Sequence, residues 1–503
     1  MSYKGLLKMK DRLKKVIDTL SEKDISRFRV FIQREKNLKK RKDLSLFEQI
    51  LTDDNIPDST AGTSPYHASR KRLMKKLTKF IMDKQQEEDE TGITSISAKM
   101  AFARYLFDHH VDEMAWIFLQ KAERQAEKNE QYNLLHAVYT MMVDYSHKEQ
   151  APDLHGVIQK RLFNKQRMDE DERAAIASGL IRQTLREKRQ SGDVTALEKM
   201  IDDTLTEYNL ENIALKRPKL IYNILSITRH HILAKKEFHS FAPYVIRHYQ
   251  RIIKQDSFSG HNHFYKLGFL YMISHILYRN RKFNKASLYL DQMSEALEAY
   301  NRSQARQYFH RYLLLKAALK CYTGQLDTSI DLLEEGLTNK EVYFPPVERL
   351  NSLINLAIYY FLKGKGREAI RTATRIGHSD HWLEKHMGKE WVFKKNLMEA
   401  IALFETGEVK TAASRIRSVE RNYSFLLDQS LYSRARPYID FLKKLMLFPT
   451  SINPEEFSEE ARKSLVTIPE EQEDLQAITF YSWLKSKIQQ KNYYETLLET
   501  VKH

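Results

Sequence analysis

Apolar and small residues recur at helical spacing along almost the whole chain. Intervals of three or four residues place side chains on one face of an α-helix. Between residues 353 and 373, such residues stand at successive intervals of 3, 1, 3, 4, 5 and 4: Leu353, Leu356, Ala357, Tyr360, Gly364, Ala369 and Ala373. This pattern predicts two amphipathic helices joined by a short turn.

The arrangement repeats along the sequence. In each segment a small residue is followed seven positions later by the expected turn, and twelve positions later by a second small residue. The first small residues are Ala103, Ser274, Ala317, Ala357 and Ala400. The last four of these are 43, 40 and 43 residues apart, which indicates a repeating unit rather than a chance match.

This repetition resembles the tetratricopeptide repeat (TPR) superfamily, most clearly between about residues 262 and 425 and also at 98–125. In that family, small residues let the two helices of a hairpin approach closely, and stacked hairpins form a right-handed superhelix with a concave face. The resemblance implies an all-α, TPR-like superhelix, a solenoid of helical hairpins. The family's usual repeat is about 34 residues long. The likeness is therefore to the broad superfamily and not to its chaperone-binding members.

Three parts are predicted along the chain. Residues 1–90 form a small basic helical domain, residues 91–447 form the solenoid, and residues 448–503 hold a segment rich in Glu and Pro followed by helices. Over 130–260 the helical pattern departs from the repeat, and we expect degenerate hairpins there. The last helix pair, at 475–501, is expected to cap the open end of the array. A docking appendage is the alternative interpretation.

The N-terminal part is predicted to contain four helices, at 6–20, from Ser21 onward, at 44–51 and at 66–81, with a linker at 85–95. Glycine (15) and proline (11) are scarce among the 503 residues, which agrees with a nearly all-helical chain. The run LSEKDISRFRVFIQ, then LFEQIL, then YHASRKRLMKKLTKFI resembles one found ahead of degenerate repeats in bacterial proteins. That resemblance is loose and implies no particular activity.

Positive charge is concentrated near the start of the chain. The formal net charge is +16, and residues 1–80 alone hold 21 Lys or Arg against 10 Asp or Glu. The stretch YHASRKRLMKKLTKFI carries six of these cations and no acid. Such asymmetry suggests an anionic partner. A solvated basic face with no partner is the alternative.

A nucleic acid bound there would be contacted at its phosphates and not read base by base. The sequence shows no clear helix-turn-helix signature, and the loop at 52–65 is too long for one. An acidic protein surface, or the chain's own Glu-rich segment at 455–474, is a rival partner. The candidate anion contacts are Lys39, Lys40, Arg41, Arg70, Lys71, Arg72, Lys75, Lys76 and Lys79.

Sequence signatures of catalysis are absent. The chain contains no G-x-x-x-x-G-K-[ST], G-x-G-x-x-G, H-E-x-x-H or G-x-S-x-G motif. His378, His381 and His386 lie close in sequence, but a zinc site would need three or four converging ligands, and the third histidine is spaced to face away from the others. We therefore interpret the polar segment 378–391 as a loop inserted between hairpins. Cys321 is the only cysteine, which excludes an intramolecular disulfide and a thiolate metal cluster. We expect no metal and no cofactor.

The expected location is the cytoplasm. No run of about 18 apolar residues occurs, so no membrane span is expected. The opening MSYKGLLKMKDRLKKVIDTL lacks the apolar run of a signal peptide. A single cysteine fits a reducing compartment.

The TPR resemblance also implies a binding face, because the first helix of each hairpin lines the concave side in that family. Carrying the family's contact positions onto this chain gives an aromatic row of Phe107, Tyr278, Cys321, Phe361 and Phe404. A polar row comprises Arg311, Asn351 and Lys394, with Tyr271, His275, Arg279 and Tyr322 nearby. Aromatic anchors beside cations suit a peptide or helix that carries apolar side chains and an acidic group. Alternatively, the aromatic row packs between hairpins.

The sequence thus predicts a non-enzymatic scaffold or adaptor that binds a protein or peptide in the concave face of a solenoid. The alternative is a regulator that contacts DNA or RNA non-specifically through the basic N-terminal domain, with the repeats sensing a peptide or protein. An enzyme whose site carries no recognisable motif is a third hypothesis.

Overall fold

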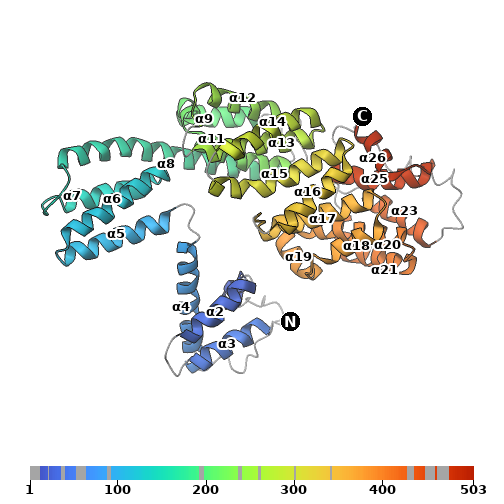
Figure 1. The fold of residues 1–503 in the computed structure, drawn as a ribbon, viewed down its shortest axis with the longest axis horizontal. Coiled ribbons are helices and arrows are strands. Elements are labelled where there is room, and N and C mark those ends of the chain that lie inside the picture. The colour runs from blue at the N-terminus through green and yellow to red at the C-terminus, as the bar shows by residue number, and fades with distance from the viewer. Residues whose placement is uncertain are drawn as a thin grey trace, which may run out of the picture. The chain divides into compact units, whose positions relative to one another are not determined.

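Helices make up the regular structure of the described chain. The computed structural model describes residues 12–17, 19–20, 22–34, 40–52, 64–87, 92–191, 197–235, 241–258, 262–299, 302–339, 342–427, 435–447, 459–460 and 475–502. Within these ranges no strand occurs, so the all-α prediction is confirmed (Figure 1).

The chain divides into two compact units, Met1–Asp169 and Glu170–His503. The division falls inside α8 (Leu154–Ser191), within the segment predicted as solenoid. The other helices of the first unit are α1 (Arg12–Ile17), α2 (Glu22–Arg34), α3 (Lys40–Thr52), α4 (Ser64–Glu87), α5 (Ile93–Asp108), α6 (Asp112–Lys128) and α7 (Tyr132–Asp144).

Helices α1 to α4 surround a core of their own. The ring centroid of Phe28 on α2 lies 5.0 Å from that of Phe47 on α3 and 5.2 Å from that of Phe80 on α4. Leu73 and Leu77 of α4 are fully buried in the same cluster. The helices predicted at 44–51 and 66–81 are confirmed and are longer than expected. Of the predicted helix at 6–20, the structure describes 12–17, which are helical, and 19–20, which are not, and Ser21 lies outside the described residues.

The predictions for two connecting regions need correction. Helix α4 continues to Glu87 and α5 begins at Ile93, so both ends of the predicted linker at 85–95 are helical. Helix α8 is one element of 38 residues where degenerate hairpins were expected. No proline interrupts it, and its glycines at 156 and 179 do not break the helix, so nothing in this stretch ends it early.

The second unit continues the pairing of consecutive helices. Its elements are α9 (Leu197–Glu207), α10 (Glu211–Lys216), α11 (Pro218–Lys235), α12 (Phe241–Lys254), α13 (His263–Arg279), α14 (Phe283–Ala299), α15 (Arg302–Tyr322), α16 (Leu326–Thr338), α17 (Pro346–Leu362), α18 (Gly366–Thr374), α19 (Asp380–Met387), α20 (Lys389–Glu405), α21 (Val409–Asn422), α22 (Ser424–Leu427), α23 (Ala435–Leu447), α25 (Leu475–Gln489) and α26 (Tyr493–Lys502).

The repeated small residues lie where paired helices meet. All five first anchors are fully buried: Ala103, Ser274, Ala317, Ala357 and Ala400. The small residues twelve positions later are fully buried as well: Ala115, Ala286, Ser329, Ala369 and Ala412. They belong to the pairs α5–α6, α13–α14, α15–α16, α17–α18 and α20–α21, which pack along their length. The hairpins predicted from the sequence are therefore present.

The residue seven positions after each anchor turns the chain. Gly364 has a φ angle of 76° and Gly407 one of 88°, in the left-handed region that a side chain disfavours. Arg281 and His110 adopt the same conformation, each with a φ of 57°, although they are not glycine. The turn geometry is thus common to these hairpins, whereas glycine is used only in some of them.

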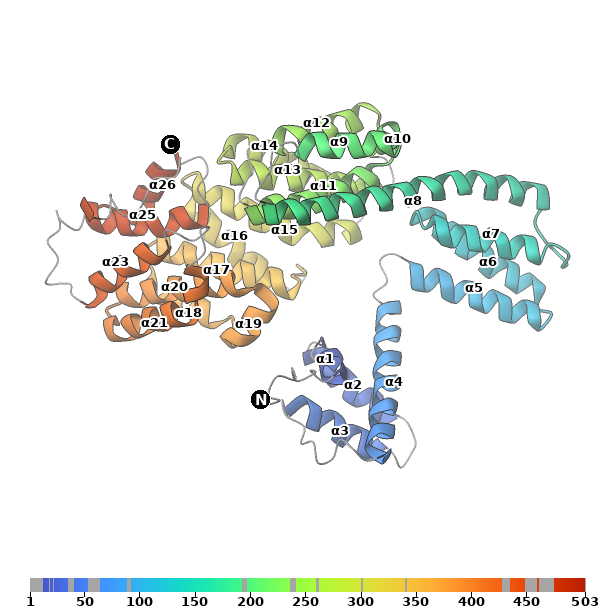
Figure 2. The same cartoon turned by 180° about the vertical axis from the view of Figure 1, so that it is seen from behind.

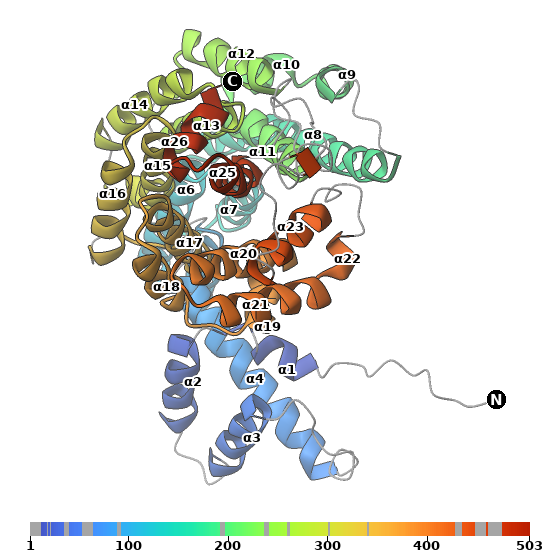
Figure 3. The same cartoon turned by 90° about the vertical axis from the view of Figure 1, so that its right-hand side faces the viewer.

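The last helix pair packs against the first helices of the preceding hairpins (Figure 3). Tyr322 of α15 shares a hydrogen bond of 3.1 Å with Thr479 of α25, and Tyr494 of α26 donates one of 2.5 Å to the carbonyl of Cys321. Helix α23 lies beside α25 (Figure 2), and the Tyr438 hydroxyl of α23 donates a hydrogen bond of 3.0 Å to the Phe480 carbonyl of α25. The pair therefore contacts α15 as well as α23.

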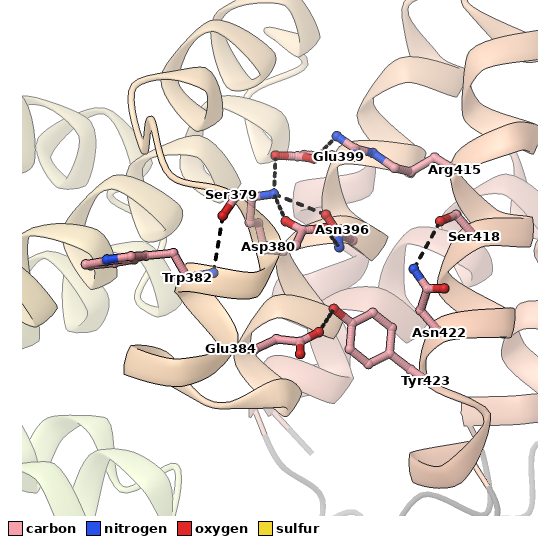
Figure 4. A network of polar contacts seen from close by, with 11 residues as sticks. Ser379, Asp380, Trp382, Glu384, Asn396, Glu399, Arg415, Ser418, Asn422 and Tyr423 are labelled. Carbon is pink, nitrogen blue, oxygen red and sulfur yellow. Dashed lines mark hydrogen bonds and ion pairs between the residues drawn. The ribbon is translucent and has the colours of Figure 1, made fainter. Parts of the chain in front are cut away.

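A network of charged and polar side chains fixes α20 between α19 and α21 (Figure 4). Lys395 of α20 is buried, and its Nζ lies 3.2 Å from Asp380 Oδ1 of α19 and 3.1 Å from Glu399 Oε1. Asn396 donates to Asp380 at 2.7 Å, and Arg415 of α21 pairs with Glu399. Lys394 directly precedes Lys395 on α20, so this network also helps to set the position of a predicted binding residue.

Replacing Lys395 by alanine is expected to lower the free energy of unfolding of the second unit by about 2 kcal/mol, because the largely buried Glu399 keeps Arg415 but loses one of its two cations. Urea unfolding followed by circular dichroism measures this. Lys444→Ala is the matched control, since the ion pair between Lys444 and Glu460 is about half exposed, and it should cost under about 1 kcal/mol. Equal losses in the two variants would contradict the structural role of Lys395.

Candidate functional site

A pocket of about 480 Å³ opens in the second unit, between the first helices of four hairpins and the C-terminal pair. We call it the central pocket. Helices α13, α15, α17 and α20 supply most of its walls, and α25 and α26 close one side. Apolar side chains such as Leu314, Ile354, Ile358 and Met398 line the interior, whereas charged and amide groups lie among them. Such a mixture is typical of sites that bury an apolar group and orient a polar one.

Arginine side chains gather around Tyr271 at one end of the central pocket. The guanidinium carbon of Arg311 lies 5.6 Å from the Tyr271 ring centroid, and that of Arg229 on α11 lies 5.1 Å from the same centroid. Glu348 reaches Arg311 only at 4.0 Å. Burial lowers the pKa of His275 well below its usual value, and the nearby Arg229 and Arg279 lower it further. His275 is therefore neutral near pH 7, and the positive charge of this end comes from the arginines.

The other polar residues of the pocket hold one another in place. Trp391 donates through Nε1 to Asn351 Oδ1 at 3.0 Å, and Asn351 donates through Nδ2 to Glu348 at 3.3 Å. Lys394 Nζ lies 2.7 Å from Glu390 Oε1, one helical turn earlier. Each cation of the polar row thus has a carboxylate nearby. A ligand would meet a preorganised set of donors and acceptors.

The aromatic row packs mainly against the chain itself. Rings of Tyr278 and Tyr322 lie 5.8 Å apart, and Phe361 lies 5.5 Å from Tyr493 of α26. Burial raises the pKa of Tyr278 far above its usual value, so this phenol carries no charge. The aromatic row therefore forms a wall that α25 and α26 cover in part. Much of its surface is buried by packing within the chain, as the alternative interpretation expects.

Nine of the ten predicted groove residues line the central pocket: Tyr271, His275, Tyr278, Arg279, Arg311, Tyr322, Asn351, Phe361 and Lys394. Phe404 does not line it, because Trp483 of α25 packs against its ring at 6.3 Å. Phe107 belongs to the first unit, where its buried ring stacks on Tyr145. Cys321 is buried, and burial raises the pKa of its thiol. Whether the nine bind a partner stays a prediction.

Several pocket residues were missed from the sequence. Glu348 and Glu390 stand one helical turn before Asn351 and Lys394, so helical spacing alone could have indicated them. Helix α25 contributes Thr479, Phe480 and Trp483. These residues lie far along the chain from the pocket residues of α17 and α20, so no local sequence pattern connects them to the pocket.

The basic stretch of α4 has two kinds of cations. Arg72 and Lys76 pair with the fully buried Asp43 of α3, at 3.2 and 3.0 Å, and so hold the helices together. Lys71, Lys75 and Lys79 are exposed, at successive intervals of four, and therefore form one stripe along α4.

The remaining candidate anion contacts differ from that stripe. Arg70 lies 5.5 Å from the Tyr66 ring centroid and donates to its hydroxyl. The side chains of Lys39, Lys40 and Arg41 lie outside the described residues. Of the predicted set, the lysine stripe is the part that α4 presents most openly.

The segment 378–391, predicted as a loop, contains the short helix α19. Ser379 caps it by accepting a hydrogen bond from the Trp382 amide. His378 and His386 stack on Trp382 with centroid distances of 3.8 and 3.9 Å, since they stand four residues before and after it. In the described part of the chain, no group of three His, Cys, Asp or Glu residues is arranged to hold a metal ion. The histidines are thus explained by ring stacking on a helix surface.

Comparison with known proteins identifies no family for this chain. Neither the protein-family models nor the curated protein sequences include a match to this chain. Among the described helices, none combines the length and the apolar character that crossing a membrane requires.

Acid is expected to destabilise the second unit through His310, which adjoins Arg311 on α15. His310 is 3% exposed, and within the described residues neither ring nitrogen has a hydrogen-bond partner. Burial, aided by Arg311 and opposed by Glu348, lowers the pKa of His310 to about 4. The unfolded state binds a proton near pH 6.5, so stability present above that pH is lost as pH falls toward 4.

The expected loss from His310 is up to about 2 kcal/mol between pH 7 and pH 5. Urea unfolding at several pH values measures it, and His310→Leu should flatten the dependence. His381→Leu, at an exposed position, serves as the control that leaves the dependence intact. An unchanged pH dependence in His310→Leu would contradict the assignment.

Proposed function

We propose that the second unit is a TPR-like repeat array that binds a peptide or protein segment in the central pocket, without catalysing a reaction. The observation that carries this proposal is the convergence of nine predicted groove residues, spread between Tyr271 and Lys394 in the sequence, on one pocket. The superhelical arrangement itself is part of the proposal. Its support comes from the repeated hairpins with their small buried anchors.

The chemistry of the pocket favours a ligand with an apolar group beside a carboxylate. The interior lined by Leu314, Ile354 and Met398 accepts the apolar group. Arg311 is 39% exposed at its side chain, and its distance of 4.0 Å from Glu348 leaves its donors available for a stronger partner. An arginine can bind a carboxylate through two hydrogen bonds. An acidic side chain or a peptide C-terminus would fit this end.

Peptides selected from a random library on the full-length chain are expected to share an acidic residue next to an apolar or aromatic one. Fluorescence anisotropy then measures the affinity of a selected peptide for each variant. The double variant Arg311→Ala with Lys394→Ala should bind the peptide at least about tenfold more weakly, because charge-assisted hydrogen bonds are lost. Asn351→Ala should weaken it less. The control, Lys71→Ala with Lys75→Ala and Lys79→Ala, should leave affinity unchanged. Selected peptides whose affinity ignores Arg311 and Lys394 would exclude the central pocket as their site.

A second candidate function rests on the lysine stripe of α4. Lys71, Lys75 and Lys79 are spaced about 6 Å apart along the helix axis, which suits successive contacts with a phosphate backbone. Arg72 and Lys76 are less available, because Asp43 binds both. We infer non-specific contact with DNA or RNA as the alternative role of the first unit.

Replacing all three stripe lysines by alanine is expected to weaken this contact strongly. Anisotropy of labelled duplex DNA and RNA at several salt concentrations should show a log–log slope shallower by about 2.7 than for the unmodified chain, since three phosphate contacts are lost. A control variant replaces Lys282, Lys285 and Lys410, which are equally exposed but lie in the second unit. Absence of binding at low salt by the unmodified chain would eliminate this role.

A further inference from the structure

A second cavity of the second unit, of about 600 Å³, lies where three helix turns meet. The turns join α17 to α18, α20 to α21, and α25 to α26. We call it the turn cavity. Its wall holds five cations, Lys363, Lys365, Arg367, Lys487 and Lys491, against two carboxylates, Glu368 and Glu405. Neither the peptide site nor the lysine stripe of α4 accounts for this excess of positive charge.

One of the two carboxylates is already bound. Glu405 accepts a hydrogen bond of 2.9 Å from Trp483 Nε1, and its Oε1 lies 2.6 Å from Lys487 Nζ. This arrangement ties α25 to the end of α20 and neutralises the carboxylate. The remaining cations therefore face one acid, Glu368, in the first turn of α18.

The other cations are available to a ligand. Lys365 and Arg367 are exposed and make no ion pair with any residue the structure describes. Lys363 pairs with Asp327 and Lys491 with Glu499, but both acids are more than half exposed and neither lines the cavity. Exposed pairs of this kind contribute little energy, so their lysines can turn toward a stronger anion.

The shape of the turn cavity also suits a compact anion. Gly366 lets α18 begin close to α20, because a Cβ there would lie 2.8 Å from the Thr406 methyl group. A Cβ at Gly364 would meet nothing within 4 Å, so the mouth of the cavity is open at that turn. No side chain caps the start of α18. Its first amide groups thus add donors to a site that the cations already define.

We propose that the turn cavity binds a small, soluble polyphosphate anion. Several cations on separate turns, together with the side-chain amide of Asn492, match an anion that carries many oxygen acceptors and several charges. A single carboxylate would use only part of this set. The site is independent of the peptide proposal and remains if that proposal fails.

Isothermal titration of the full-length chain with sodium tripolyphosphate tests the proposal. We expect saturable binding of one anion per chain, weakened at least about tenfold by Lys365→Ala with Arg367→Ala. Thermal melting without ligand should be unchanged in that variant, because both side chains are exposed. The matched control is Lys410→Ala with Arg417→Ala, which removes the same two charges from the exposed face of α21 and should bind normally.

Four outcomes would overturn the proposal. The first is the absence of saturable binding by the unmodified chain. The second is an equal loss in the matched control, which would indicate attraction by net charge alone. The third is binding only to vesicles that carry phosphoinositides, without binding of free tripolyphosphate, which would indicate a membrane surface as the partner. Loss of binding in the variant of Lys71, Lys75 and Lys79 instead would assign the anion to α4.

Discussion

Close contact between consecutive helices is the constraint on which the rest of this structure depends. Small side chains at two positions, twelve residues apart, are fully buried in each hairpin, as Ala357 and Ala369 are between α17 and α18. A larger side chain there would push the helices apart and open the core that they share. Because a single hairpin leaves one apolar side uncovered, each pair needs its neighbour, and the spacing of the repeats is set by this mutual covering.

The first helices of the hairpins carry both a packing surface and the candidate binding residues. The C-terminal pair covers much of the aromatic row, through Trp483 on Phe404 and Tyr493 on Phe361. The polar row is left accessible around the central pocket, where Arg311 and Lys394 keep partly exposed charges. Burial of apolar area thus stabilises the fold. Charged residues, whose burial would cost desolvation free energy, remain accessible as the candidate contacts for a ligand. This division explains why the pocket is small and mixed in character.

Charge is divided in the same way in the N-terminal helices. Asp43 has no exposed surface, and two cations of α4 compensate it, since an unpaired buried carboxylate would be strongly destabilising. The three lysines that remain exposed have no such task. A basic sequence run therefore mixes cations that hold the fold with cations that can meet a partner, and only their surroundings distinguish the two kinds.

The sequence by itself determined the all-helical class, the hairpins at Ser274, Ala317, Ala357 and Ala400, and the residues on the first helix of each of these pairs, because these follow from local spacing along one helix. Only the tertiary structure decided that α25 and α26 lie against those helices, that Phe404 is covered, and that Asp43 binds two of the cations. Each of these features depends on contacts between residues far apart in the chain. Such contacts form where the surfaces of whole helices are complementary in shape, and the local sequence pattern does not show this complementarity.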